Sequence, residues 1–308
     1  MNFNSVIAKN RFKTNCVIAL YLCIFLIIGL LVDIVRINAP SLSYGFYVLL
    51  TFQVLPIITL LMVGVALAIV LYSVSNFKRI LLSGNEYKEI IQGAEVSPLE
   101  RDLSRILDEL VREAGIEFRP KLYLMEAPFM NAFASGWQAN NSIIAVTTTL
   151  AQRLSYNELK AVVAHELSHI RHGDIRLTLS VGILSNIMLL VVNYGVYMFL
   201  GNSREQGANA ARMILLVMQF VLPLLTMVLQ MFLSRNREYM ADSGAAYLMG
   251  ESNSMIRALQ KISDNYAQTD FTQSDANPTR KALYIFGVKE LFSTHPSIEN
   301  RIQALMAK

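Results

Sequence analysis

The sequence predicts a mainly α-helical integral membrane protein, in which four transmembrane helices carry an α+β domain with a small β-sheet. Charged residues make up 16% of the 308 residues, against about 25% in soluble proteins, and the mean hydropathy is +0.40. Several long stretches contain no charged residue at all. This composition excludes a disordered chain, collagen and a solvated coiled coil. The net charge of +4 is too small to indicate a nucleic-acid partner.

The uncharged stretches are residues 14–32, 46–73, 177–201 and 213–234. Each is close to or above the roughly 20 apolar residues that cross the hydrocarbon core of a bilayer. No small-x-small cleavage site follows the first stretch, so we interpret it as an uncleaved anchor rather than a signal peptide. The last two stretches contain Asn and Gln residues and a proline, which are less typical of a membrane span. For these two stretches the alternative interpretation is a pair of buried helices in a soluble protein.

Lys and Arg indicate how the chain is oriented. Lys9, Arg11 and Lys13 precede the first stretch, and Lys78 and Arg79 follow the second. The positive-inside rule therefore predicts that both termini and both polar segments are cytoplasmic. The predicted division is a first transmembrane hairpin in 1–73, a polar segment in 74–176, a second hairpin in 177–234, and a second polar segment in 235–308.

The first polar segment has the patterns of a mixed domain. Ser97-Pro98 with Glu100 indicates a capped helix that ends at Gly115. Another capping box, Ser155 with Glu158, begins a second helix. Between them the sequence predicts a strand at 121–126 and a β-hairpin of strands 131–136 and 142–148.

The second of these helices contains His165-Glu166-x-x-His169. Residues four apart stack on one helical face, so both imidazoles can reach one metal ion while Glu166 can act on a metal-bound water. The alternative is a helix with two surface histidines. Thiolate ligands are not expected, because Cys16 and Cys23 both lie in the first apolar stretch.

A catalytic zinc ion needs a third protein ligand and one open position. A metzincin motif does not continue from His169, because His172 stands at its glycine position; we expect His172 to be a surface or interfacial residue. Glu238 and Asp242 follow the fourth apolar stretch and share one helical face. A transmembrane hairpin formed by the last two stretches would return Glu238 to the two histidines. The alternatives are an interfacial Glu238 paired with a neighbouring arginine, and an Asp242 on the helix surface.

Four sequence segments resemble the HtpX family of bacterial membrane zinc metallopeptidases, relatives of the eukaryotic CAAX prenyl proteases, and the resemblance extends over essentially the whole chain. They are HELSH at 165–169, RNREYMAD at 235–242, NAFASG at 131–136 and HPSIENRI at 295–302. The resemblance implies a zincin-type (gluzincin) protease domain with one Zn²⁺ per chain, held by His165, His169 and Glu238. Glu166 would be the general base, and Asp242 would orient a ligand imidazole. The active site would face the cytoplasm at the inner membrane.

The resemblance also implies partners: polypeptide substrates, mainly misfolded or damaged membrane proteins, the lipid bilayer, and other membrane quality-control proteases. His295 and Arg301 would donate hydrogen bonds to the oxyanion or hold the C-terminal segment over the cleft; the alternative is a helix start with a structural arginine. Asn131, Ala132, Phe133 and Ala134 are expected to form an edge strand that pairs with extended substrate, and the alternative is a plain hairpin strand.

Other functions remain as alternatives. A membrane transporter or receptor should carry ionisable residues within its spans, and none of the four stretches contains one. A zinc-dependent pseudo-enzyme would retain the ligands without the base, yet Glu166 is present. Among enzymes, the rival is a processing protease for a specific membrane or lipidated substrate.

Overall fold

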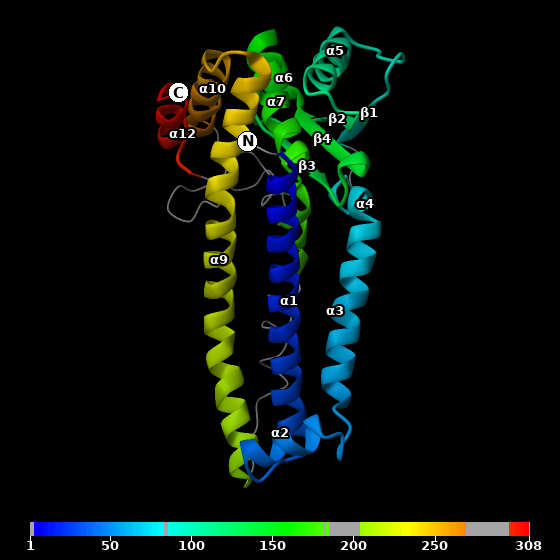
Figure 1. Ribbon diagram of the computed structural model, residues 1–308, viewed down its shortest axis with the longest axis vertical. Coiled ribbons are helices and arrows are strands. Elements are labelled where there is room, and N and C mark those ends of the chain that lie inside the picture. Colours follow the sequence, from blue (N-terminus) through cyan, green and yellow to red (C-terminus); the bar gives the residue numbers. More distant parts are fainter. Residues whose placement is uncertain (1–2, 83–85, 182, 185–203, 269–295, 308) are drawn as a thin grey trace. The chain divides into compact units, whose positions relative to one another are not determined.

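The computed structural model describes residues 3–82, 86–181, 183–184, 204–268 and 296–307 (Figure 1). Most of the described residues are helical, and one small mixed sheet is present. The chain forms two compact units. The first contains residues 1–13, 76–179 and 230–308, and the second contains 14–75 and 180–229.

Three described helices are long and apolar enough to cross a membrane. They are Ile7–Arg36 within α1 (Phe3–Arg36), Ile57–Ser75, which is α3, and Gln206–Leu225 within α9 (Gln206–Met249). The fourth predicted stretch lies inside α9. Of the third, residues 177–181 and 183–184 are helical, while 182 and 185–201 lie outside the described residues. The described part of the chain therefore supports several membrane spans.

The second predicted stretch is not one helix. It is divided between α2 (Leu42–Leu50) and α3 (Ile57–Ser75), which are separated by a turn. Pro56 explains the interruption, because proline has no amide hydrogen and disfavours helix in the residue before it. The buried carboxylate of Asp33 accepts hydrogen bonds from the amides of Ile58 and Thr59 at 3.3 and 2.8 Å. Asp33 thereby caps α3 from α1.

A four-stranded sheet organises the first unit. Its strands are β1 (Tyr87–Ile90), β2 (Lys121–Met125), β3 (Ala132–Gly136) and β4 (Ser142–Thr147), in the order β1-β2-β4-β3. Strands β2 and β4 are parallel, and the other neighbouring pairs are antiparallel. The predicted strand and hairpin are confirmed, with β3 at one edge of the sheet. Strand β1 was not predicted, because its four residues show no clear alternation of apolar and polar side chains.

Helices cover the sheet and complete a single hydrophobic core, in which α7 packs against α5, α10, β3 and β4 (Figure 1). The helices of this unit are α4 (Phe77–Leu81), α5 (Pro98–Glu113), α6 (Thr148–Arg153), α7 (Tyr156–His172), α10 (Asn253–Gln268) and α12 (Ile298–Met306), together with the C-terminal part of α9.

The two predicted helix starts differ in detail. The capping box of Ser155 and Glu158 is confirmed, and the Glu158 carboxylate also accepts a hydrogen bond from Lys261 of α10 at 2.7 Å. At α5, Ser97 caps the helix, but the Glu100 carboxylate accepts from the amide of Val96 rather than closing the box. The Ser155 box fixes the start of α7, the helix that carries both histidines of the predicted motif.

Candidate metal centre

Helix α7 holds His165 and His169 on one face, one turn apart. Their Nε2 atoms are 3.2 Å from each other, and the two rings meet edge to face at 86°. His165 is fully buried, because the surrounding positions of α7 are apolar and face the core. The alternative of two surface histidines is therefore excluded for this helix.

Helix α9 brings Glu238 to the two imidazoles. Its carboxylate oxygens lie 3.5 Å from His165 Nε2 and 3.8 Å from His169 Nε2, and one candidate ligand atom from each residue lies within 4.8 Å of the other two. Glu238 is buried. Of the neighbouring Arg235 and Arg237, which are the alternative partners of Glu238, Arg237 instead donates to Thr178 Oγ1 and to the carbonyl of Asp174.

A separate carboxylate contacts the other nitrogen of each imidazole. Asp242 Oδ1 lies 2.9 Å from His165 Nδ1, and Asp174 Oδ2 lies 3.0 Å from His169 Nδ1. A carboxylate that accepts the Nδ1 hydrogen leaves the Nε2 lone pair available, which is the tautomer a metal requires. Both lone pairs then face the space that Glu238 also faces.

Asp174 was missed in the sequence, although a signal for it exists. Gly173 ends α7 in the left-handed conformation, with φ of 68°, and this turn brings Asp174 back to His169. A glycine that ends the helix shortly after the motif, followed directly by an acid, marks such a returning turn.

The guanidinium of Arg301, on α12, contacts Asp242 in a bidentate pair. Arg301 Nε lies 2.9 Å from Asp242 Oδ2, and Nη2 lies 2.6 Å from Oδ1. Its Nη1 is 3.6 Å from Glu238 Oε2. Arg301 is fully buried, so α12 is attached to the centre by a desolvated ion pair. His295, the other residue predicted from that segment, lies outside the described residues.

The carboxylates and the burial shift the pKa values at this centre. Burial lowers the pKa of His165, but hydrogen bonds to Asp242 and Glu238 outweigh it and raise the pKa to about 9. Burial also lowers the pKa of His169, but the charge of Asp174 and the hydrogen bond to it outweigh burial, so the pKa lies above its ordinary value. The pKa of Asp242 is lowered, because the charge of Arg301 outweighs burial. The site therefore attracts positive charge to the two imidazoles.

The donor set fits a zinc ion. Two nitrogens and a carboxylate oxygen are typical ligands of catalytic zinc, and tetrahedral bonds of about 2.0–2.1 Å place ligand atoms about 3.4 Å apart. The closest separations here are 3.2, 3.5 and 3.8 Å. Glu238, Asp242 and Asp174 carry buried negative charge, which a divalent cation would help to compensate together with the guanidinium of Arg301.

Glu166 lies between this centre and the edge strand β3. It is buried, and burial raises the pKa of its carboxyl group, although the neighbouring histidines and a hydrogen bond from the Ala134 amide act in the opposite direction. A raised pKa suits a carboxylate that accepts and returns a proton near neutral pH.

Every second residue of strand β3 directs its backbone amide and carbonyl away from the neighbouring strand β4. The carbonyl of Asn131 accepts from the Thr147 amide at 2.9 Å, so the next residue, Ala132, directs its amide outward. That amide donates to the Asn131 side chain at 2.8 Å, and the Ala134 amide donates to Glu166. Residues Asn131 to Ala134 are all buried in this structure.

His172 differs from its prediction. It is buried rather than exposed or interfacial, because its ring packs against α9 near Gly244. An alanine Cβ at Gly244 would lie only 2.5 Å from Ser168 Oγ, so the two helices approach closely there. His172 is not part of the group of potential metal ligands found among the described residues.

Comparison with known proteins places these residues in a family context. Residues 97–308 match the model of peptidase family M48. A protease HtpX homologue of Helicobacter pylori (strain Shi470) is 58% identical over 304 residues, covering 99% of this chain and 98% of that protein. The homologue of a Sulfurovum species (strain NBC37-1) is 34% identical over 71% of this chain and 82% of that protein. The crystal structure of S. mikatae Ste24p has the same fold, with a TM-score of 0.51 and 18% identity over 80% of this chain and 58% of that chain.

Proposed function

We propose that this chain, which belongs to peptidase family M48 and is a membrane metalloprotease of the HtpX type, is a zinc endopeptidase that cleaves misfolded or damaged membrane proteins. The observation that carries the proposal is the convergence of His165, His169 and Glu238, in which both imidazoles are oriented by carboxylates. We further propose an inner-membrane location with a cytoplasmic active site, from the distribution of Lys and Arg.

The mechanism assigns a role to each buried group. Zinc, when bound, acidifies a water molecule and polarises the scissile carbonyl. Glu166 takes the proton from the attacking water and delivers it to the amine that leaves. Asp242 and Asp174 hold the two imidazoles in the tautomer that presents Nε2, and Arg301 keeps Asp242 ionised and in place. For His295 and Arg301 the proposal keeps both roles, as donors to the oxyanion or as residues that hold the C-terminal segment over the cleft.

Metal removal tests the proposal directly. In detergent solution, treatment with 1,10-phenanthroline is expected to abolish casein cleavage, because the imidazoles and Glu238 alone cannot activate water. Addition of stoichiometric Zn²⁺ after removal of the chelator should restore the original rate. The measurement is initial rate together with zinc content. Full cleavage by zinc-free protein would contradict the proposal, and so would zinc-restored protein that stays inactive although it remains folded.

The outward groups of β3 support substrate binding by strand addition. Ala132→Pro removes the outward amide of Ala132 while leaving the ladder to β4 intact. We expect kcat/KM for casein to fall at least about ten-fold, the loss of one or two backbone hydrogen bonds, with zinc content unchanged. Ala132→Gly is the matched control, because it retains the amide and should cleave at a rate close to that of the wild type. Equal activity of the proline and glycine variants would exclude the edge-strand role.

A further inference from the structure

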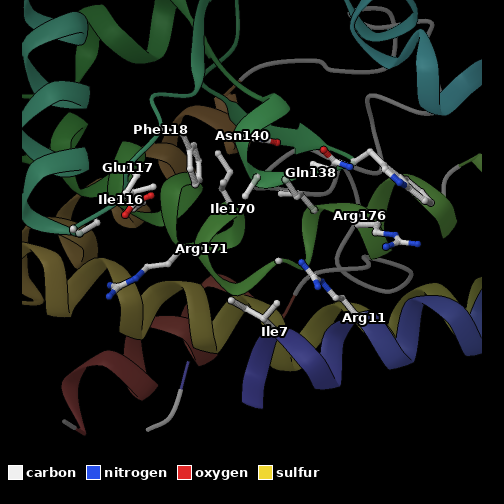
Figure 2. A pocket seen from close by; sticks show the side chains of 16 residues that line it. Ile7, Arg11, Ile116, Glu117, Phe118, Gln138, Asn140, Ile170, Arg171 and Arg176 are labelled. Carbon is white, nitrogen blue, oxygen red and sulfur yellow. The ribbon is translucent and has the colours of Figure 1, made fainter. Parts of the chain in front are cut away.

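A cavity of about 820 Å³ lies in the first unit, and none of the proposed metal ligands lines it (Figure 2). Its walls come from the start of α1, the turn after α5, the turn between β3 and β4, and the end of α7 with the residues that follow. This size is within the roughly 300–1,000 Å³ of small-molecule sites. We call it the arginine pocket, after Arg11, Arg171 and Arg176, which line it.

The arginine pocket has a cationic end. Figure 2 shows Arg11 and Arg176 on the same side of it, and burial and then the charge of Arg11 lower the pKa of Arg176. The guanidinium of Arg176 lies over the ring of Trp137, 4.1 Å from its centroid. Glu117 is the one acid among the lining residues, so the arginines outnumber the acids. Guanidinium groups arranged in this way favour a phosphate ligand.

The remainder of the arginine pocket is apolar. Ile7, Ile116, Phe118, Ile170 and Ile175 contribute to its lining, and Phe118 and Ile170 lie in the middle of the view in Figure 2. A free phosphate would fill a small part of such a cavity and would leave these side chains against water. The combination instead fits an amphiphile, whose anionic head meets the arginines and whose carbon chain meets the isoleucines.

The position of Arg11 along the chain indicates the source of that amphiphile. Arg11 lies in the candidate membrane span Ile7–Arg36, shortly before the uncharged residues that begin at Thr14. Basic residues at this point of a span lie at the level of the lipid headgroups. Arg11 is exposed and, in the part of the chain that the structure describes, has no ion-pair partner.

We propose that the arginine pocket binds an anionic phospholipid that is partly withdrawn from the bilayer, whose phosphate is held by Arg11 and Arg176 and one of whose acyl chains extends away from the membrane against Phe118 and Ile170. This inference goes beyond proteolysis and does not depend on it, because the residues are distinct from the proposed metal ligands and the test measures binding. The pocket shares α7 with the metal centre, since Ile170 and Arg171 directly follow His169.

The chain contains its own probe for this pocket, because Trp137 is its single tryptophan. The full-length protein, purified in dodecyl maltoside, is titrated with dioleoyl phosphatidylglycerol while Trp137 emission is recorded. Native mass spectrometry counts the bound lipid independently. Dioleoyl phosphatidylcholine tests the requirement for net negative charge, and glycerol 3-phosphate represents a soluble phosphate source.

We expect a saturable change with phosphatidylglycerol and at least about ten-fold weaker binding of the other two compounds. Arg11→Gln should weaken phosphatidylglycerol binding about ten-fold or more, the effect of losing one charge-assisted hydrogen bond. Lys9→Gln is the matched control, since this exposed cation on α1 does not line the pocket, and it should stay within about two-fold of wild type. Equal binding of phosphatidylcholine or of glycerol 3-phosphate, equal losses in the two variants, or no response in either measurement would overturn the proposal.

Discussion

Glu166→Gln is expected to lower kcat/KM for casein about 10²–10⁴-fold while the protein retains its zinc, because the amide cannot accept a proton from the attacking water. Glutamine has nearly the same shape as glutamate and can occupy the same buried position beside the Ala134 amide. The measurement combines initial cleavage rates with zinc content in the same preparations. Unchanged zinc separates loss of the base from collapse of the site.

Glu166→Asp provides the graded comparison, since it retains the carboxyl group and shortens the side chain by one methylene. Its kcat/KM should fall between those of wild type and Glu166→Gln. Wild-type rates in Glu166→Gln would show that another group accepts the proton, and the role assigned to Glu166 would then be wrong.

Arg301→Met is expected to destabilise the protein strongly, because it leaves the carboxylate of Asp242 buried without its cation. Both side chains of this pair are almost fully buried, and two short contacts join them. Removal of one partner from such a pair costs about 3–5 kcal/mol of the free energy of unfolding. For a chain of this size, that corresponds to a thermal midpoint about 6–20 °C lower. Thermal unfolding in detergent measures the shift.

The double variant Asp242→Asn with Arg301→Met tests the cause. If an uncompensated charge is responsible, the double variant should recover much of the stability lost by Arg301→Met alone. Arg301→Lys retains the charge but cannot form the bidentate pair, so it should be intermediate. A midpoint for Arg301→Met within about 2 °C of wild type would contradict this assignment.

The residues of the candidate centre were accessible to sequence reasoning where helical spacing decides the geometry. His165 and His169 are four apart on one helix, and Glu238 and Asp242 are four apart on another, so each pair shares a face. Asp174 was missed, because its contact with His169 depends on the left-handed turn at Gly173 rather than on helical spacing. The partner of Arg301 could not be predicted either, since Asp242 lies on a different helix and only tertiary packing brings them together.

In the fold, too, the features that depend on local sequence were predicted, and those that depend on tertiary packing were not. The hairpin of β3 and β4 and the start of α7 follow from local patterns and capping residues. Residues 46–73 were predicted as one span because proline is tolerated within transmembrane helices, whereas in the structure α2 ends at Leu50 and α3 begins directly after Pro56. Burial of His172 depends on its close contact with α9 at Gly244, which the sequence of α7 alone does not reveal.

Zinc stoichiometry in single-ligand variants tests the central claim most directly. Wild-type protein equilibrated with buffered Zn²⁺ should hold one zinc per chain, measured by plasma mass spectrometry. His165→Ala, His169→Ala and Glu238→Ala should each hold almost none, because two remaining ligands cannot retain the ion. His172→Gln, a change on the same helix outside the proposed ligand set, should retain the full amount. Full zinc in any of the three ligand variants, or zinc loss in His172→Gln equal to theirs, would contradict the proposed centre.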